Sequence, residues 1–485
     1  MNRRDFFAQA GVSMGGAALA ASRPASPAPA GERPAPRKPA PEGAKKRPAI
    51  AGPLKVHPTN GRYFSDDGRR AVYLTGSHTW PSLVDMGPTD PPPRFDFAAY
   101  LDFLDRYDHN FIRLWTWELS QWNTQANGEN ARHVVWPLAF ARTGPGTALD
   151  GKPKFDLAKY DPEYFGRLRR RVTAARDRGI YVSVMLFEGW GMQFVADAWK
   201  AHPFHPANNT SGLGGKVAKG VDVYTLAHPS ITHVQEAYVR HVVDTVGDLD
   251  NVLYEISNEN HPSSTEWQYH VIRLLHAYER TKPKQHPVGM TYQYKGGTNR
   301  ALFDGPADWV SPNPDGGYRD DPPAADGRKV ILNDTDHLWG IGGNRVWAWK
   351  SFLRGTNPLF MDPYDGAVLG KKLDPRWEPV RKSLGATLRL ATRLNLASMT
   401  PEPSLASSAY CLAGNTGRGM EYLVYLPKGG EVSVDLAPAR RSMTVRWIRP
   451  EEGDGPAGAN VDGGARRTFV APFAGDAALW IKPAG

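Results

Sequence analysis

Three acidic side chains stand where two apolar runs of the chain end. Glu259 follows the run 252–256 and comes directly after Asn258, while Asp334 and Asp336 close a later run. Cleavage of a glycosidic bond needs one carboxyl group that protonates the leaving oxygen. It also needs a second carboxylate that attacks the anomeric carbon or activates a water molecule. These residue types predict Glu259 as the acid/base and one of the two aspartates as its partner.

The choice between Asp334 and Asp336 is open from the sequence. Alternation along a strand puts both side chains on the same side, so the parity of the strand does not separate them. We favour Asp336 as the nucleophile because it lies nearer the tip of the run and is followed by His337 and Trp339.

The carboxylates need a scaffold that brings distant run ends together, and the pattern of the chain predicts one. Short apolar runs alternate with helical patterns from residue 70 onward, as in a parallel sheet wound by helices. The runs are 71–75, 111–115, 180–187, 252–256, 288–292, 309–311, 329–334 and 358–361, and helical patterns cover 97–107, 162–178, 232–246, 264–280, 344–354 and a last stretch opening at Pro379. Eight runs in this order predict an α/β fold, a (β/α)8 TIM barrel over residues 52–400, with its active site at the carboxyl ends of the strands. The sixth run is weak and no helix is predicted after it.

The two ends of the chain differ from this pattern. Residues 401–485 alternate apolar and polar side chains between Gly/Pro turns, which predicts a small all-β sandwich. Residues 1–21 resemble a twin-arginine signal peptide, with Arg3 and Arg4 before a modest apolar run. Residues 22–51 are rich in Pro and Ala and predict a disordered linker. We therefore expect an exported protein, periplasmic or secreted, without a membrane anchor in its mature form.

Other polar and aromatic residues near the run ends are candidates for substrate contact. Arg113 is placed to orient the strand-seven carboxylate, and the alternative is a buried ion pair with Glu255. Glu118 is a further carboxylate near a strand end, and we expect it either to accept hydrogen bonds from sugar hydroxyls or to have a purely structural role. The remaining candidates for substrate binding are Asn258, His78, Trp80, Trp115, Glu188, His261, Tyr292, His337, Trp339 and Asp362.

Several segments together resemble a known family of enzymes. The segment Tyr-Leu-Thr-Gly-Ser-His-Thr-Trp-Pro at 73–81, the segment Asn-Phe-Ile-Arg-Leu-Trp at 110–115, the Asn-Glu pair at 258–259 and the Asp-Thr-Asp-His run at 334–337 are similar to apiosidase-type glycoside hydrolases. The likeness covers about residues 53–485. It implies a clan-A (β/α)8 barrel in which the strand-four Glu is the acid/base, its Asn neighbour holds a sugar 2-hydroxyl and the mechanism is retaining. It also implies a C-terminal β-domain of the type associated with collagen binding. In apiosidases an Asp ends strand four and a Glu ends strand seven, the reverse of this chain.

Charge and cysteine content narrow the function classes. The net charge of +9 is concentrated in residues 1–50, which hold nine basic and three acidic side chains, so residues 51–485 carry only +3. Such a balance argues against a nucleic-acid partner and leaves a carbohydrate as the expected one. With Cys411 as the one cysteine, no intrachain disulfide can form, and no cofactor is expected.

Three other functions remain open from the sequence. One is a metal-dependent hydrolase that uses His78, Asp334, Asp336 and His337 as ligands, although their spacing matches no standard metal motif. The second is a non-catalytic carbohydrate-binding barrel. The third is a polysaccharide lyase, whose products would carry unsaturated ends that absorb in the ultraviolet.

Overall fold

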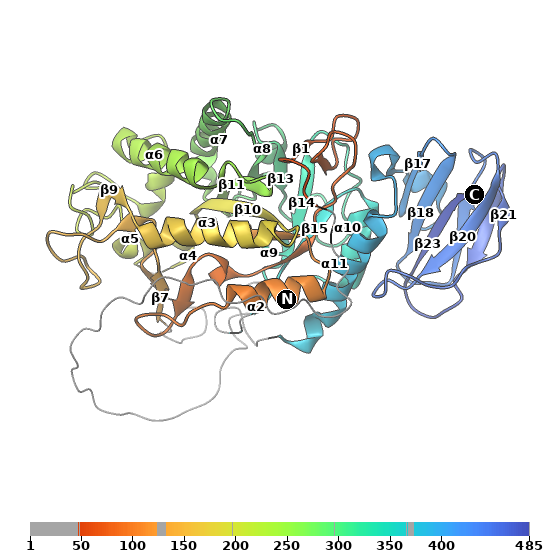
Figure 1. Ribbon diagram of the computed structural model, residues 1–485, viewed down its shortest axis with the longest axis horizontal. Coiled ribbons are helices and arrows are strands. Elements are labelled where there is room, and N and C mark those ends of the chain that lie inside the picture. Colours follow the sequence, from red (N-terminus) through yellow and green to blue (C-terminus); the bar gives the residue numbers. More distant parts are fainter. Residues whose placement is uncertain are drawn as a thin grey trace, which may run out of the picture.

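The computed structural model describes residues 47, 49–123, 132–195, 197–294, 296–364, 366 and 373–484. Within them the chain forms a (β/α)8 barrel followed by a β-domain of antiparallel sheets (Figure 1). The β-domain, drawn in blue, lies beside helices α10 and α11 of the barrel.

Eight parallel strands make the barrel wall. In chain order they are β3 (Gly76–His78), β5 (Phe111–Leu114), β10 (Tyr181–Glu188), β11 (Val252–Asn258), β12 (Val288–Thr291), β13 (Trp309–Ser311), β14 (Val330–Asp334) and β15 (Asn357–Met361). They are hydrogen-bonded in the order β3-β15-β14-β13-β12-β11-β10-β5. Each strand is therefore next to its neighbour in the chain, as in a TIM barrel.

The barrel closes where β3 meets β5. The Asn110 amide donates to the Thr75 carbonyl at 3.0 Å, and the Asn110 side chain donates to the Tyr73 carbonyl at 2.8 Å. A Cβ atom on Gly76 would lie 2.3 Å from the carbonyl oxygen of Phe111. The closing strands can therefore approach this closely only because residue 76 has no side chain.

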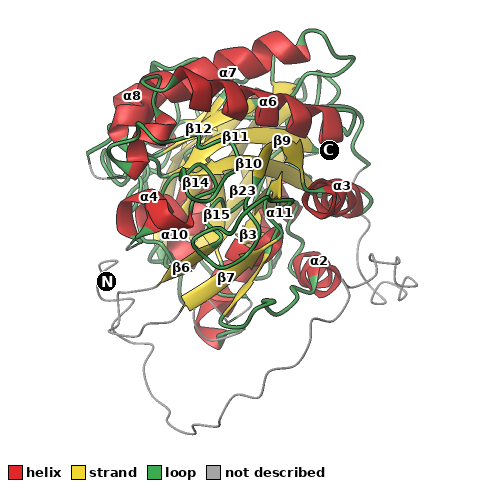
Figure 2. Cartoon of the chain, turned by 90° about the vertical axis from the view of Figure 1, so that its left-hand side faces the viewer, coloured by secondary structure: helices red, strands yellow, loops and turns green. Residues whose placement is uncertain are grey.

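Helices surround the strands, as Figure 2 shows in a view toward one end of the barrel. The long helices are α2 (Phe97–Arg106), α3 (Pro162–Arg176), α6 (Pro229–Val246), α7 (Thr265–Glu279), α10 (Arg345–Leu353) and α11 (Glu378–Ala391), and the short ones are α4 (Gly191–Phe194), α5 (Ala198–Ala201), α8 (Asn299–Phe303) and α9 (Thr335–Leu338). Asp96 and Asp161 begin α2 and α3 by accepting hydrogen bonds from first-turn amides. Short sheets form outside the barrel wall from β1 (Lys55–Val56) with β2 (Phe64–Ser65), from β4 (Asp85–Gly87), β7 (Arg132–Trp136) and β6 (Gln121–Asn123), and from β8 (Phe140–Ala141) with β9 (Asp156–Tyr160).

The C-terminal domain has two layers. One is a six-stranded antiparallel sheet, and the other is a pair of strands that packs on its outer face. The six are β16 (Thr400–Pro401), β17 (Cys411–Asn415), β18 (Met420–Leu426), β23 (Ala477–Pro483), β20 (Ser442–Ile448) and β21 (Val461–Asp462), and the pair is β19 (Glu431–Asp435) with β22 (Arg466–Val470). The inner face of the larger sheet packs on the barrel, where Tyr425 stacks with Trp349 of α10 at 5.6 Å between ring centroids. The small β-sandwich expected from the sequence is thus present.

Most of the expected elements lie within a few residues of their predicted places. The first strand is the exception, because it is Gly76–His78 and not 71–75. No helix occurs among the residues described between β13 and β14, as expected. The described residues contain no helix long and apolar enough to span a membrane. The predicted signal peptide and nearly all of the predicted linker lie outside the described residues, so both stay predictions.

Candidate active site

A buried arginine links the ends of two distant strands. Arg113 of β5 donates to Asn258 at 2.6 Å and, through one Nη1 atom, to Asp334 at 3.0 Å and Asp336 at 3.1 Å. It also makes two bonds to Glu255, at 2.9 and 2.5 Å. Burial opposes the charge of Arg113, which is 1% exposed, but these carboxylates raise its pKa far above the usual range. Both roles considered for Arg113 therefore occur together.

Asp334 lies at the centre of a fixed set of donors. Its carboxylate accepts from Arg113, from His78 Nε2 at 2.9 Å and from the backbone amide of Asp336 at 3.0 Å. Trp115 donates its indole N–H to His78 Nδ1 at 2.9 Å, so that His78 must present a proton on Nε2 toward Asp334. Burial alone would raise the pKa of Asp334, but His78 and Arg113 outweigh it and hold that pKa well below its usual range.

The position of Asp336 in the fold differs from the one expected from the sequence. Strand β14 ends at Asp334, which caps α9, and Asp336 lies in the first turn of that helix. The parity argument for the two aspartates is therefore wrong, because Asp336 is not on a strand. Both carboxylates still reach the same Arg113 nitrogen, and the next residue, His337, lies between Ser311 Oγ at 2.6 Å and Asn258 Oδ1 at 3.2 Å.

Glu259 is held in a strained backbone conformation directly after β11. Its φ angle is +45°, in the left-handed region that non-glycine residues adopt at a cost of about 1–3 kcal/mol. Its carbonyl accepts from the Gln193 side chain at 2.7 Å, and its amide lies 3.4 Å from Thr291 Oγ1. The side chain is 1% exposed. Strain of this kind is typical of functional sites, where the surrounding contacts impose it.

Glu188, at the end of β10, is a buried carboxyl group near Glu259. Its carboxyl accepts from the amides of Trp190 at 2.8 Å and Gly191 at 2.9 Å. Burial, with the charges of Glu118 and Glu259, raises the pKa of Glu188 well above its usual value despite these bonds. A raised pKa at this position favours the protonated form of Glu188 beside Glu259.

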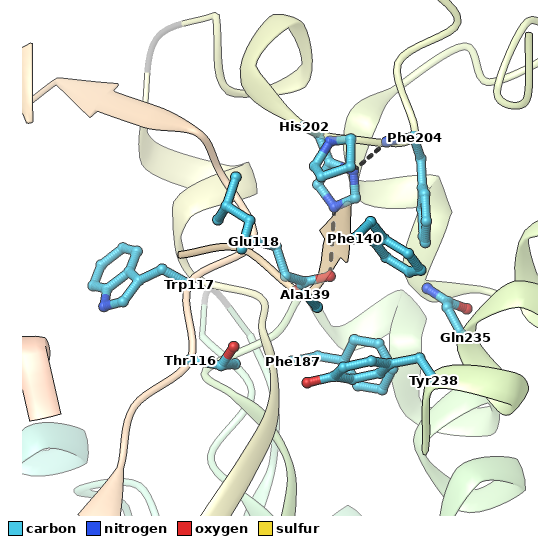
Figure 3. A pocket seen from close by; sticks show the side chains of 12 residues that line it. Thr116, Trp117, Glu118, Ala139, Phe140, Phe187, His202, Phe204, Gln235 and Tyr238 are labelled. Atoms are coloured by element: carbon cyan, nitrogen blue, oxygen red, sulfur yellow. Dashed lines mark hydrogen bonds and ion pairs between the residues drawn. The ribbon is translucent and has the colours of Figure 1, made fainter. Parts of the chain in front are cut away.

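Glu118 fixes the backbone of Glu188 through a hydrogen bond. Its carboxylate accepts from the Glu188 amide at 2.9 Å and from the Tyr224 hydroxyl at 2.7 Å. A cavity of about 20 Å³ lies on its other side, where His202 and Gln235 also face it (Figure 3). That volume suits one water molecule and is far too small for a sugar ring.

The aromatic candidates divide by exposure. Trp80 and Trp115 are buried, and Trp80 packs edge-on against other tryptophan rings, so a sugar contact is not favoured for either. A sugar contact is not favoured for His78 either, because both of its ring nitrogens form hydrogen bonds, one with Asp334 and one with Trp115. In contrast Tyr292 and Trp339 are half-buried. These two rings remain candidates to pack on a sugar face.

Two other candidates are held by local structure. Asp362 lies after β15 with both oxygens bonded to Arg381, at 2.5 and 2.8 Å, which makes it a buried ion pair with α11. His261 is half-buried and caps a short 3-10 turn by accepting from the Ser263 amide at 3.2 Å. Sequence reasoning did not single out Gln193 or Ser311. Ser311 ends the sixth strand, and that position is the signal that could have identified it.

The proposed metal ligands do not form a metal site. Among the residues that the structure describes, no three His, Cys, Asp or Glu side chains are arranged to hold an ion. His78 Nε2 and Asp334 bond to each other instead. The alternative of a metal-dependent hydrolase gains no support from this geometry.

Comparisons with known proteins support the fold. A family described as Domain of unknown function (DUF6298) matches residues 130–295, and no curated protein sequence matches the chain. The chain is similar in structure to a glycoside hydrolase family 5 protein from Bacteroides vulgatus, with 13% identity, 89% of this chain and 94% of that chain covered and a TM-score of 0.58. It is also similar to a protein described as a glycoside hydrolase, with 12% identity, 90% and 97% covered and a TM-score of 0.56. At such identities the likeness shows that the chain has the fold of these hydrolases.

Proposed function

We propose that this protein is a glycoside hydrolase that cleaves O-glycosidic bonds of a plant or microbial polysaccharide or oligosaccharide with retention of configuration. The observation that carries the proposal is the Arg113 cluster. One guanidinium joins Asn258, which directly precedes Glu259, to Asp334 at the end of β14 and to Asp336 in α9. Asn258 at the end of strand four and the carboxylates at the end of strand seven thus meet at the carboxyl end of a barrel, where the pair needed for glycoside hydrolysis has to be.

Each carboxylate has a role that its surroundings support. Glu259 is the acid/base, held by the strained turn after β11. Asp336 is the nucleophile and Asp334 is a positioning residue. The contacts support this assignment, because both oxygens of Asp334 are fixed by His78, Arg113 and a backbone amide. An oxygen that has to form a bond to carbon must leave such contacts, which is costly for a buried ion pair.

The reaction then runs in two displacements. An Asp336 oxygen attacks the anomeric carbon while the bond to the leaving oxygen breaks, and Glu259 gives that oxygen a proton. Glu259 next removes a proton from water, whose oxygen attacks the anomeric carbon and displaces Asp336. Arg113 Nη1 donates to the Asp336 carboxylate at 3.1 Å and so positions it for the first displacement.

The fold and its likeness to glycoside hydrolases agree with this activity. The twin-arginine-type segment at residues 1–21 adds the proposal that the enzyme acts in the periplasm or outside the cell. A polysaccharide substrate is consistent with such a location.

The test is a screen of the full chain against aryl glycosides and plant and microbial polysaccharides, with Glu259→Gln as the background control. We expect hydrolysis of at least one substrate by the wild type and its loss in the variant. Proton NMR of the first-released sugar should then show the anomer of the substrate. Glycan binding without turnover, unchanged in Glu259→Gln, would instead support a non-catalytic barrel.

A further inference from the structure

A second cavity lies next to α9, the helix that carries Asp336. Its volume is about 600 Å³, enough for a sugar residue. Its walls come from the segment between β13 and β14, from α10 and the residues just before it, and from the start of α11 with the 3-10 turn Pro375–Trp377 that precedes it. The lining residues are Arg319, Asp320, Trp339, Gly343, Asn344, Arg345, Val346, Trp347, Lys350, Arg376, Trp377, Pro379 and Val380. Trp339, which directly follows α9, is both a lining residue of this cavity and one of the rings that remain candidates to pack on a sugar.

Basic side chains outnumber acidic ones in the lining, although residues 51–485 are nearly neutral. Four basic side chains line the cavity, with Asp320 as the one acidic side chain among its lining residues. The basic residues have ion-pair partners, Asp320, Asp374, Asp476, Glu451 and Asp321, and of these carboxylates only Asp320 is part of the lining. The surface that faces the cavity therefore presents more positive than negative groups.

Aromatic rings accompany these charges. Trp339 and Trp377 are half-buried, so each has part of its ring open to the surroundings. The Arg376 guanidinium lies 5.9 Å from the centre of the Trp377 ring. A ring face beside a cation suits a sugar that carries an anionic group, because the C–H face packs on the ring while the anion pairs with the cation.

The amino ends of two helices add a weaker electrostatic attraction for an anion. Both α10 and α11 begin at this cavity, and the amino ends of helices carry partial positive charge. In barrels of this type the loops after the seventh and eighth strands, which α10 and α11 follow, are frequent places for anions.

We propose that this cavity binds a sugar residue bearing a carboxylate or sulfate group, so that the substrate is an acidic glycan. The role as a substrate subsite rests on the proposed hydrolase function, whereas the binding itself does not. The anionic group pairs with the exposed Arg319 and Arg376, and the sugar ring packs on Trp339 or Trp377.

The experiment measures binding by calorimetry to the Glu259→Gln chain, which prevents turnover. The probes are an oligomer of galacturonate, the same oligomer fully methyl-esterified and a sulfated oligosaccharide. We expect the methyl ester to bind at least about 10-fold more weakly than the galacturonate or the sulfated probe, with an affinity that falls as salt is added. Adding Arg319→Gln and Arg376→Gln together should weaken binding of the anionic probe about 10-fold or more.

A matched control exists elsewhere on the chain. Arg328 pairs with Asp326 two residues before it, as Arg376 pairs with Asp374, and the two side chains are 64% and 74% exposed. Arg328→Gln should leave the affinity unchanged. Equal binding of the ester and the acid, or an equal loss in Arg328→Gln, would overturn the inference. Hydrolysis of neutral glycans with no binding of either anionic probe overturns the inference alone, while anion binding without turnover of any glycan overturns only the proposed function.

Discussion

Asp334→Asn should mainly lower the stability of the fold, whereas Asp336→Asn should mainly lower turnover. The Asp334 carboxylate is completely buried and accepts from Arg113, His78 and a backbone amide at 2.9–3.0 Å. Breaking a buried ion pair costs about 3–5 kcal/mol. Asparagine keeps one acceptor oxygen, and Arg113 keeps its ion pair with Glu255. We therefore expect Asp334→Asn to lower the free energy of unfolding by about 3 kcal/mol, the lower end of this range.

The same change at Asp336 should cost less stability. Asp336 shares one Arg113 nitrogen with Asp334, at 3.1 Å, and a hydrogen bond to a charged group contributes about 1.5–3 kcal/mol. As the nucleophile, however, Asp336 is required for the first displacement. We expect Asp336→Asn to remove turnover almost completely and Asp334→Asn to leave a measurable fraction of it.

Two assays separate these effects. Denaturant unfolding gives the stability loss of each variant, and hydrolysis of the best aryl glycoside from the screen gives turnover. For glycine variants, added azide should restore release of the aryl group in Asp336→Gly, with a glycosyl azide of inverted configuration, and not in Asp334→Gly. Rescue of Asp334→Gly alone would show that Asp334 is the nucleophile and that the contact argument is wrong.

Two further predictions concern the groups that hold this site. His109 accepts from the Ser77 amide and bonds to the Arg381 carbonyl, and burial lowers its pKa to about 3. The unfolded chain therefore takes up a proton near pH 6.5 that the folded chain does not, so stability falls as the pH falls below 6.5, by about 2 kcal/mol at pH 5. Unfolding of wild type and His109→Asn at pH 7 and 5 should show the wild-type advantage shrinking by about that amount, and a constant difference would refute the assignment. Trp115→Phe removes the N–H that fixes His78, and we expect a loss of about 1–3 kcal/mol in unfolding experiments. An unchanged stability would show that the Trp115 bond does not hold His78 in place.

The alternation of apolar runs and helical patterns was enough to predict the barrel, because both periods are set by burial on one face. The first strand was misplaced for a local reason. Residues 71–75 are apolar and resemble a strand, and Val72 does pair with Phe64, but the barrel strand is the Gly76–His78 segment that follows. A pattern of apolar residues does not detect this strand, because its residues are polar and are buried by the closing contacts with β5 and His109.

The site was predicted by residue type more than by arrangement. The position of Glu259 after the fourth strand followed from the pattern, whereas its positive φ did not. Arg113 was expected to bind one carboxylate, and its simultaneous contacts with Glu255, Asp334 and Asp336 depend on how strands far apart in the chain are brought together. The end of β14 at Asp334 could not be read from the sequence, since the run that follows is as compatible with a strand as with the short helix α9.

The central claim is that Glu259 protonates the leaving oxygen, and its most direct test is the dependence of Glu259→Gln on the leaving group. A dinitrophenyl glycoside needs no protonation to depart, whereas an alkyl glycoside or a natural glycosidic bond does. Loss of the acid should slow the natural bond by about 100-fold to 10,000-fold while release of the first dinitrophenyl group remains fast. Glu266→Gln, an exposed carboxylate on α7, is the control that should keep both rates. Equal rates in Glu259→Gln and the wild type on the natural bond would contradict the account.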